Sequence, residues 1–387
     1  MIEFKISAPG RIVLSGKHAA MYGKPVVMAS IDRYTTVKFS ELNDGPREIK
    51  IEFPDVALSL NVSLEQVLNF FSCNNSFDMT LDHCRLLRLV QSWITLNGMW
   101  STQEQRFSLQ TFFFLLFIIA YDKKFVIKSF HVHVSTQLPI GAGLGSSSSF
   151  AVCLAACFIH WARLQNGANY AFNEQELTSI SNYAMYCERI SQNYMFGADN
   201  YVCSYGKTIK SRYEQDSYYN DIINMPTMKI LLIDTNIRQN KDERATQIAE
   251  LKHSRPDFVD LNLRKYNISS TNICKKLVAM NNINQEDNIP IHEIQMSVYQ
   301  QLQTLIYVDQ LIVQNLGLSH PSIDMIGSIT RDLGCWENPT DFGGLVYILL
   351  PPIIPEELFG NLKRHLREMG FNIMRACVCC SGVRIDD

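Results

Sequence analysis

The sequence Q-L-P-I-G-A-G-L-G-S-S-S-S-F-A-V-C-L-A-A-C-F, from Gln137 to Phe158, follows a strand and leads through a glycine-rich loop into an apolar helix. His131 to Val134 alternates polar and apolar residues as a strand does, and Pro139 ends that strand. Three glycines follow at alternate positions, and the run from Phe150 to Ile159 contains no Gly or Pro, which favours a buried helix. Glycines let backbone N–H groups approach an oxyanion, and a helix start adds free donors and about half a positive charge. The pattern therefore predicts an anion-binding loop.

The glycine spacing separates this loop from two other phosphate-binding patterns. No Gly-Lys-Ser/Thr follows the glycines, as it would in a Walker loop, and G-x-G-x-G is not the dinucleotide fingerprint. A Gly/Ser-rich turn that only connects two elements is the alternative. Four serines, Ser146 to Ser149, favour a binding role, because hydroxyls at a helix start can bind phosphate or a hard cation.

The composition is that of an ordinary globular protein. The chain has 387 residues, of which 47% are hydrophobic and 19% charged, which is enough for two packed domains. A formal net charge of -3 gives no argument for a nucleic-acid-binding surface. The most apolar run, Phe112 to Ala120, is shorter than the roughly 20 residues that span a bilayer. No cleavable signal precedes the first strand, so we expect a cytoplasmic protein with reduced cysteines and no membrane partner.

By pattern alone, the N-terminal segment is a β-hairpin that leads into a loop. Glu3 to Ala8 is a short strand, Pro9-Gly10 turns it, and Arg11 to Leu14 alternates again. On this pattern Arg11 is a solvated charge. The polar segment Ser204 to Ser217 is predicted to be rich in turns.

The central loop resembles the phosphate loop of the GHMP small-molecule kinases, with which it shares L-P-x-G-A-G-L-G-S-S. Within that superfamily, A-V-C-L-A-A is most similar to the kinases that phosphorylate mevalonate. Residues Ala8 to Pro25, A-P-G-R-I-V-L-S-G-K-H-A-A-M-Y-G-K-P, resemble the first motif of the superfamily. This resemblance implies that Arg11 reaches the reacting phosphate and the substrate hydroxyl, and that His18 lines the substrate pocket. Lys17 stands at the edge of the same pocket, where the family has Glu.

A second helix carries an acidic residue. Asn173 is a suitable N-cap, and Glu176 follows three residues later, as in a capping box. Glu188 lies beside the apolar stripe of this helix, where an acidic side chain is usually half exposed. GHMP kinases have a similar helix Glu followed at the same spacing by G-x-D-N, which is here Gly197 to Asn200. The resemblance implies that Glu188 and Ser147 bind Mg²⁺.

The same resemblance assigns the catalytic base to Asp199, with Arg11 as its cationic partner. Between Glu188 and Asp199 the family has roughly H-G-N-P-S-G, and this chain has Q-N-Y-M-F-G. Phe196 in this segment would make the substrate side of the pocket bulkier and more apolar.

The nucleotide is expected at the loop and at two positions near it. We assign the phosphates of ATP to Gly141, Ala142, Gly143, Leu144, Gly145, Ser146 and Ser147. Asp55, in E-F-P-D, stands where the family has an Asn that touches the nucleotide, although an acid is less suitable there. Thr136, at the end of the strand before the loop, is assigned to the same site.

The resemblance implies an α/β (α+β) fold with the two-domain GHMP architecture and ligands in the cleft between the domains. We place the boundary near Met225, which gives domains of residues 1–225 and 226–387. The expected reaction is ATP- and Mg²⁺-dependent phosphorylation of mevalonate to 5-phosphomevalonate, in a protein whose family commonly forms homodimers. Another GHMP kinase and a catalytically weak ligand-sensing relative are the alternatives. Lys17, Phe196 and a third glycine motif reduced to Gly343-Gly344 favour the sensing relative.

Overall fold

The computed structural model describes most of the chain. The described residues are 2–16, 19–43, 45–74, 77–168, 170–191, 197–214, 217–235, 237, 241–283, 291–331, 335, 337–339 and 344–386. Lys17, His18, Phe196 and Gly343 lie outside these ranges.

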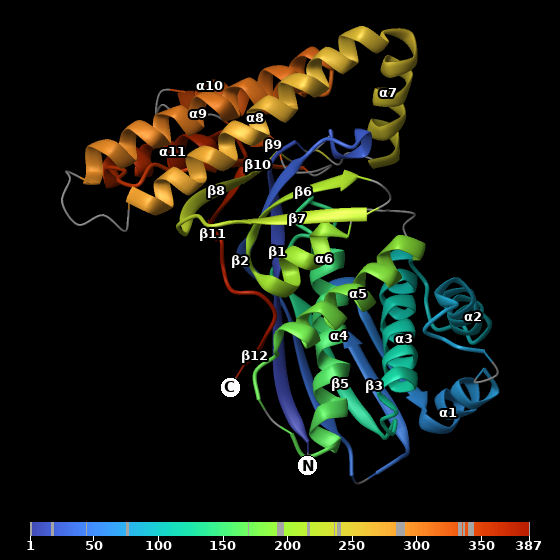
Figure 1. The fold of residues 1–387 in the computed structure, drawn as a ribbon. Helices are drawn as coiled ribbons and strands as arrows, with labels where there is room; N and C mark the ends of the chain where they lie inside the picture. Colours follow the sequence, from blue (N-terminus) through green and yellow to red (C-terminus); the bar gives the residue numbers. More distant parts are fainter. Residues whose placement is uncertain are drawn as a thin grey trace.

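Twelve strands in the described part of the chain form one mixed sheet (Figure 1). They are β1 (Glu3–Ser15), β2 (Val26–Glu41), β3 (Glu48–Phe53), β4 (Leu58–Ser63), β5 (Phe130–Thr136), β6 (Thr208–Glu214), β7 (Ser217–Ile223), β8 (Met228–Asp234), β9 (Glu337–Pro339), β10 (Leu345–Leu349), β11 (Asn372–Val378) and β12 (Arg384–Asp386). The main path runs β4-β3-β5-β2-β11-β8-β10-β9, while β1 pairs with β2 and β12, and β6 pairs with β2 and β7. The segment predicted to be rich in turns therefore contains β6.

The sheet continues across the boundary expected near Met225. Strand β11 pairs with β2 through Val378 and Ile31, and with β8 along its whole length. The last strand, β12, returns to pair with β1 at the other end of the chain. The division into residues 1–225 and 226–387 stays a prediction.

Eleven α-helices and two short 3-10 helices cover the described sheet. They are α1 (Leu64–Cys73), α2 (His83–Leu96), α3 (Gln103–Lys123), α4 (Ser146–Gln165), α5 (Glu174–Ser191), α6 (Ala198–Tyr205), α7 (Lys241–Ser254), α8 (Pro256–Ile283), α9 (Ile291–Asn315), α10 (Pro321–Arg331), α11 (Glu356–Glu368), η1 (Ala20–Tyr22) and η2 (Pro54–Val56). Helices α1 to α5 gather around β1 to β5, and α7 to α11 gather at the other end of the molecule (Figure 1).

Helix α4 is the core helix of the N-terminal half. It packs against β1 and β2 on one side and against α3 and α5 on the other. By length and composition it could cross a membrane, but 83% of its most apolar window is buried inside the molecule. Its apolar surface is therefore used by the protein core. The capping box predicted for α5 is confirmed, since Glu176 N donates to Asn173 Oδ1 and Asn173 N donates to Glu176 Oε2, both at 3.0 Å.

The C-terminal strands have helices on both faces, and their side chains alternate accordingly. Leu232 and Tyr347 pack into a cluster with α8 and α9. Their neighbours Leu231 and Val346 pack into a second cluster with α10 and α11. Alternation of this kind places a sheet between two apolar layers.

The hairpin predicted at Pro9-Gly10 is wrong, because β1 runs straight through it. The register against β2 shifts between Pro9 and Gly10, which marks a bulge. Proline has no N–H for the ladder, and a bulge accommodates it. A Cβ on Gly10 would lie 2.5 Å from Leu138 Cδ2 and 2.7 Å from Leu144 O, so only glycine lets the central loop approach β1 this closely.

We predict that Gly10→Ala destabilises the protein by about 1–3 kcal/mol, because the backbone carbonyl of Leu144 must move to make room. Gly360→Ala is the matched control, since Gly360 lies in α11 and a methyl group added there would have nothing within 4 Å. It should stabilise the helix by up to about 1 kcal/mol. Urea unfolding of both variants measures the difference, and equal stability of the two would contradict the close approach.

Candidate active site

Arg11 and Asp199 form a buried ion pair at the centre of the site. Arg11 Nη2 donates to Asp199 Oδ2 at 2.7 Å, and the two side chains are only 6% and 4% exposed. Arg11 belongs to β1 and Asp199 to the first turn of α6, so the pair joins elements that are 188 residues apart. The two residues that the sequence resemblance assigns to catalysis therefore lie in direct contact.

Arg11 also holds the glycine loop. Its Nη1 donates to Gly143 O at 2.8 Å, and its backbone N donates to Leu144 O at 2.9 Å. Gly145 comes equally close, since a Cβ there would lie 2.8 Å from Arg11 Cγ. Arg11 thus connects Asp199, β1 and the glycine loop.

The loop has the backbone geometry of an anion site. Gly141, Gly143 and Gly145 have φ angles of 74°, 75° and 72°, in the left-handed region that favours glycine. Leu144 between them is buried and anchors the loop in the core. Gly145 is the N-cap of α4 and offers no side-chain cap, so the first N–H groups of the helix are available to an anion.

Glu188 is a second buried carboxylate, 6% exposed, although its position on α5 predicted half exposure. Ser148 Oγ donates to this carboxylate and lies 3.0 Å from Oε1 and 2.9 Å from Oε2. The side chains of Ser147 and Asn200 also form hydrogen bonds with it. The sequence resemblance pairs Glu188 with Ser147 but does not point to Ser148 or Asn200. The packing of α4 and α6 against α5 decides which of their polar side chains face the carboxylate.

Burial raises the pKa of Glu188, and the negative charge of Asp199 raises it further. The hydrogen bonds from the two serines and from Asn200 lower it, but the pKa still lies above the usual value for a glutamate. Among the described residues of the site, Arg11 forms its ion pair with Asp199, whereas Glu188 accepts hydrogen bonds from neutral serine and asparagine side chains. The site is suited to an additional cation.

The donors around Glu188 fit Mg²⁺, which prefers carboxylate and hydroxyl oxygens. Glu188 would be the anionic ligand, and Ser147, which lines the cavity, would supply a hydroxyl. No group of three or more Asp, Glu, His or Cys side chains among the described residues is arranged to hold a metal. Phosphate oxygens and water would therefore complete the coordination, as is usual for Mg²⁺.

A cavity of about 310 Å³ extends from the loop between α3 and the turn after β3. Its polar end is formed by Gly141, Ser146, Ser147 and Glu188. Its apolar walls include Phe53, Val56, Phe107 and Phe150. A cavity with one anion-binding end and one apolar end is shaped for a ligand that joins a phosphate chain to a flat ring.

Asp55 and Thr136 lie together in one wall of this cavity. The backbone N–H of Thr136 donates to Asp55 Oδ2 at 2.8 Å, so Thr136 takes part through its main chain. Asp55 belongs to η2, the 3-10 turn between β3 and β4. The structure brings these two residues to the cavity that ends at the glycine loop, and their contact with a nucleotide stays a prediction.

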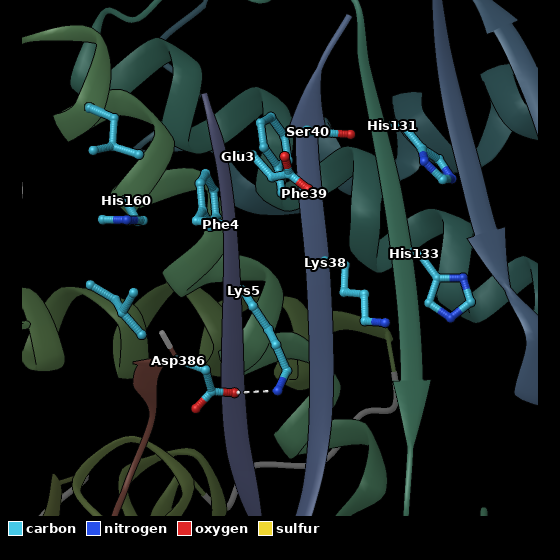
Figure 2. Close-up of a pocket in the computed structure, with 12 residues that line it drawn as sticks. Glu3, Phe4, Lys5, Lys38, Phe39, Ser40, His131, His133, His160 and Asp386 are labelled. Carbon is cyan, nitrogen blue, oxygen red and sulfur yellow. Dashed lines mark ion pairs between the residues drawn. The ribbon is translucent and has the colours of Figure 1, made fainter. Parts of the chain in front are cut away.

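A second, wider hollow of about 980 Å³ lies elsewhere on the sheet (Figure 2). Lys5, Lys38, His131, His133 and Asp386 are among the residues that line it, and Lys5 forms an ion pair with Asp386 at 3.3 Å. It shares no lining residue with the cavity at the loop, and none of the predicted site residues lines it. The cavity at the loop is therefore the candidate active site.

Residues 113–207 match the sequence profile of the GHMP kinases N terminal domain, a segment that contains the loop, Glu188 and Asp199. Mevalonate kinase of Bos taurus is 25% identical over 390 residues, which cover 98% of this chain and 94% of the relative. Mevalonate kinase of Arabidopsis thaliana is 24% identical and covers 99% of this chain and 100% of the relative.

Among solved structures, L. major mevalonate kinase in complex with R-mevalonate superimposes with a TM-score of 0.62. The identity is 14%, and the match covers 99% of this chain and 97% of that one, which establishes a shared fold. The expected GHMP fold and the resemblance to mevalonate kinases are confirmed. The roles of individual site residues stay predictions.

We predict that Glu188→Gln stabilises the ligand-free protein at neutral pH, because it removes a buried charge whose pKa is raised in the folded state. The free-energy cost of burying the Glu188 charge is absent below the unfolded-state pKa, near 4.5. This cost grows as the pH rises through the folded-state pKa. The stability gap between variant and wild type should therefore close near pH 4 and open toward pH 7.

Chemical denaturation from pH 4 to pH 8 measures this gap. Glu174→Gln is the control, because Glu174 is exposed on the same helix and its replacement should change stability by less than about 0.5 kcal/mol. A Glu188→Gln variant that is less stable than wild type at pH 7 would mean that a positive charge already compensates Glu188.

Proposed function

We propose that this protein is a GHMP kinase that transfers the terminal phosphoryl group of ATP to the primary hydroxyl of mevalonate and so forms 5-phosphomevalonate. The observation that carries the proposal is the buried Arg11–Asp199 pair, which lies against a glycine loop at a helix start. Alignment with mevalonate kinases over nearly the whole chain supports mevalonate as the substrate.

The loop would hold the β- and γ-phosphates of ATP. Backbone N–H groups of Gly141 to Ser147 and the open N-terminus of α4 supply donors and partial positive charge. The apolar part of the cavity, between Phe107 and Val56, would take the adenine ring. This arrangement would hold the phosphate chain beside the ion pair, and phosphoryl transfer depends mainly on such positioning.

Glu188 and Ser147 would bind Mg²⁺ beside the phosphates. When bound, Mg²⁺ neutralises part of the phosphate charge and orients the terminal group. The buried carboxylate of Glu188 would then gain the cation that its surroundings favour. The chain itself buries this carboxylate, and hydrogen bonds from two serine hydroxyls and Asn200 orient it.

Asp199 would receive the proton of the attacking hydroxyl. Its Oδ2 is held by Arg11, and its Oδ1 is buried and accepts no hydrogen bond from any described residue. A buried acceptor without a donor is costly, so a bound hydroxyl is a suitable partner for Oδ1. Arg11 would also stabilise the negative charge on the oxygens of the transferring phosphoryl group.

The sequence resemblance assigns Lys17, His18 and Phe196 to the substrate side of the pocket, and all three lie outside the described residues. Lys17 replaces an acid of the family and could serve as a counter-charge for the mevalonate carboxylate. The intact constellation of Arg11, Glu188 and Asp199 favours a catalyst over a ligand-sensing relative, which would need no base beside the phosphate loop.

A coupled assay of ADP release with mevalonate, 5-phosphomevalonate and galactose as acceptors tests the substrate. Turnover with 5-phosphomevalonate or galactose but not with mevalonate would assign the chain to another GHMP activity.

We predict that Asp199→Asn lowers kcat by at least about a hundredfold, because the hydroxyl loses its proton acceptor. The Kd for ATP should stay within about threefold of wild type, since Asp199 faces the hydroxyl and the loop binds the phosphates. Asp221→Asn is the matched control, because Asp221 pairs with Arg212 at 2.8 Å on the exposed β6–β7 hairpin. It should leave kcat unchanged.

Calorimetry gives the Kd, and the coupled assay gives kcat. A folded Asp199→Asn protein that no longer binds ATP would remove Asp199 from the role of base and make it part of the nucleotide site.

A further inference from the structure

We propose that Gln105 is a positioning residue for the nucleotide, because its hydrogen bonds connect the two walls of the cavity in which the adenine ring would lie. Gln105 is in the first turn of α3 and is 7% exposed. It does not itself line the cavity. The inference rests on the proposed use of ATP and concerns a residue that no motif singles out.

The side-chain amide of Gln105 uses both of its ends. Nε2 donates to Val56 O and to Ala57 O, both at 3.1 Å. Oε1 accepts from Ser101 N at 2.9 Å and from Ser101 Oγ at 2.8 Å. One buried amide therefore links the turn after β3 to the segment that starts α3.

These two segments are the opposite walls of the cavity. The turn contributes Asp55 and Val56, and α3 contributes Phe107 and Thr111. Gln105 lies behind them and sets the distance between them. The width of the space for a flat ring then depends on hydrogen bonds that the ligand never touches.

The turn needs external support to keep its shape. Ala57 ends η2 with φ 50° and ψ 43°, a left-handed conformation that costs free energy for a residue other than glycine. Its backbone N donates to Pro54 O at 3.0 Å, which closes the turn on itself. Side-chain hydrogen bonds then hold the turn on two sides: Asp55 Oδ2 accepts from Thr136 N on β5, and Gln105 of α3 donates to Val56 O and Ala57 O.

Loss of the Gln105 amide should leave the turn attached on one side only. Val56 O and Ala57 O lose a donor, and the left-handed backbone at Ala57 loses its support. The wall would then move relative to α3, and a ligand would have to order it on binding. The expected cost appears in nucleotide affinity and not in the chemical step, because Arg11 and Asp199 lie at the other end of the site.

The matched control lies five residues along the same helix. Gln110 is 3% exposed, like Gln105, but its amide contacts Gln91 of α2 at 3.5 Å and no part of the cavity. Ser101→Ala is a second control, since it removes one donor to Oε1 and leaves both bonds to the turn.

We expect Gln105→Leu to raise the Kd and the KM for ATP about tenfold, while kcat and the KM for mevalonate stay within about twofold. Gln110→Leu and Ser101→Ala should leave the ATP affinity within about twofold. Amide hydrogen exchange of residues 55–58 should become faster in ligand-free Gln105→Leu and not in Gln110→Leu. Gln105→Asn, which is shorter by one methylene, serves where the leucine variant does not fold and should shift both readouts in the same direction.

Wild-type affinity in a folded Gln105→Leu or Gln105→Asn protein, or unchanged exchange of the turn, would overturn the positioning role. A parallel loss of kcat and of mevalonate affinity would do the same, because it indicates general damage to the fold. The proposed function fails by a different result, which is a wild-type protein that binds ATP but phosphorylates no mevalonate. The ATP affinities and the exchange rates still decide the role of Gln105 in that case.

Discussion

A buried charge in a protein must be paired, and the pairing of Arg11 with Asp199 is the constraint on which the rest of the site depends. Removing one partner of such a pair typically costs about 3–5 kcal/mol, because the other charge stays buried without compensation. The pair therefore fixes α6 against β1. Through Gly143 O and Leu144 O, the same arginine also holds the glycine loop, so the positions of Asp199, Arg11 and the loop depend on one another.

The site also holds more negative charge than its described cation balances. Glu188 and Asp199 are both buried, and each is supported by hydroxyl, amide or guanidinium donors. Such an arrangement raises the free energy of the ligand-free protein. A divalent cation and a substrate hydroxyl would remove this cost on binding, so the site would favour these ligands. The raised pKa of Glu188 is the measurable sign of this preference.

The parts that sequence could predict are those that local rules determine. The capping box of Asn173 and Glu176 and the glycine loop need only residues that are close in the chain. The bulge at Pro9-Gly10 was missed because its cause, the approach of Leu144, lies far along the chain. Helix α8 was not predicted, because polar residues such as Asn262 and Ser270 occupy buried positions and interrupt the apolar stripe.

The same distinction explains which site residues the sequence identified. Arg11, Glu188 and Asp199 are assigned to chemistry that allows few residue types, so a motif can point to them. Asp55 shows where the argument from residue type fails: an acid is unsuitable beside a nucleotide by charge alone, yet its Oδ2 accepts the backbone N–H of Thr136. The oxygen of an asparagine could accept the same bond. The wall of the cavity therefore requires an acceptor at this position, whichever charge it carries, and the hydrogen bond to β5 relieves part of the negative charge that the nucleotide would meet.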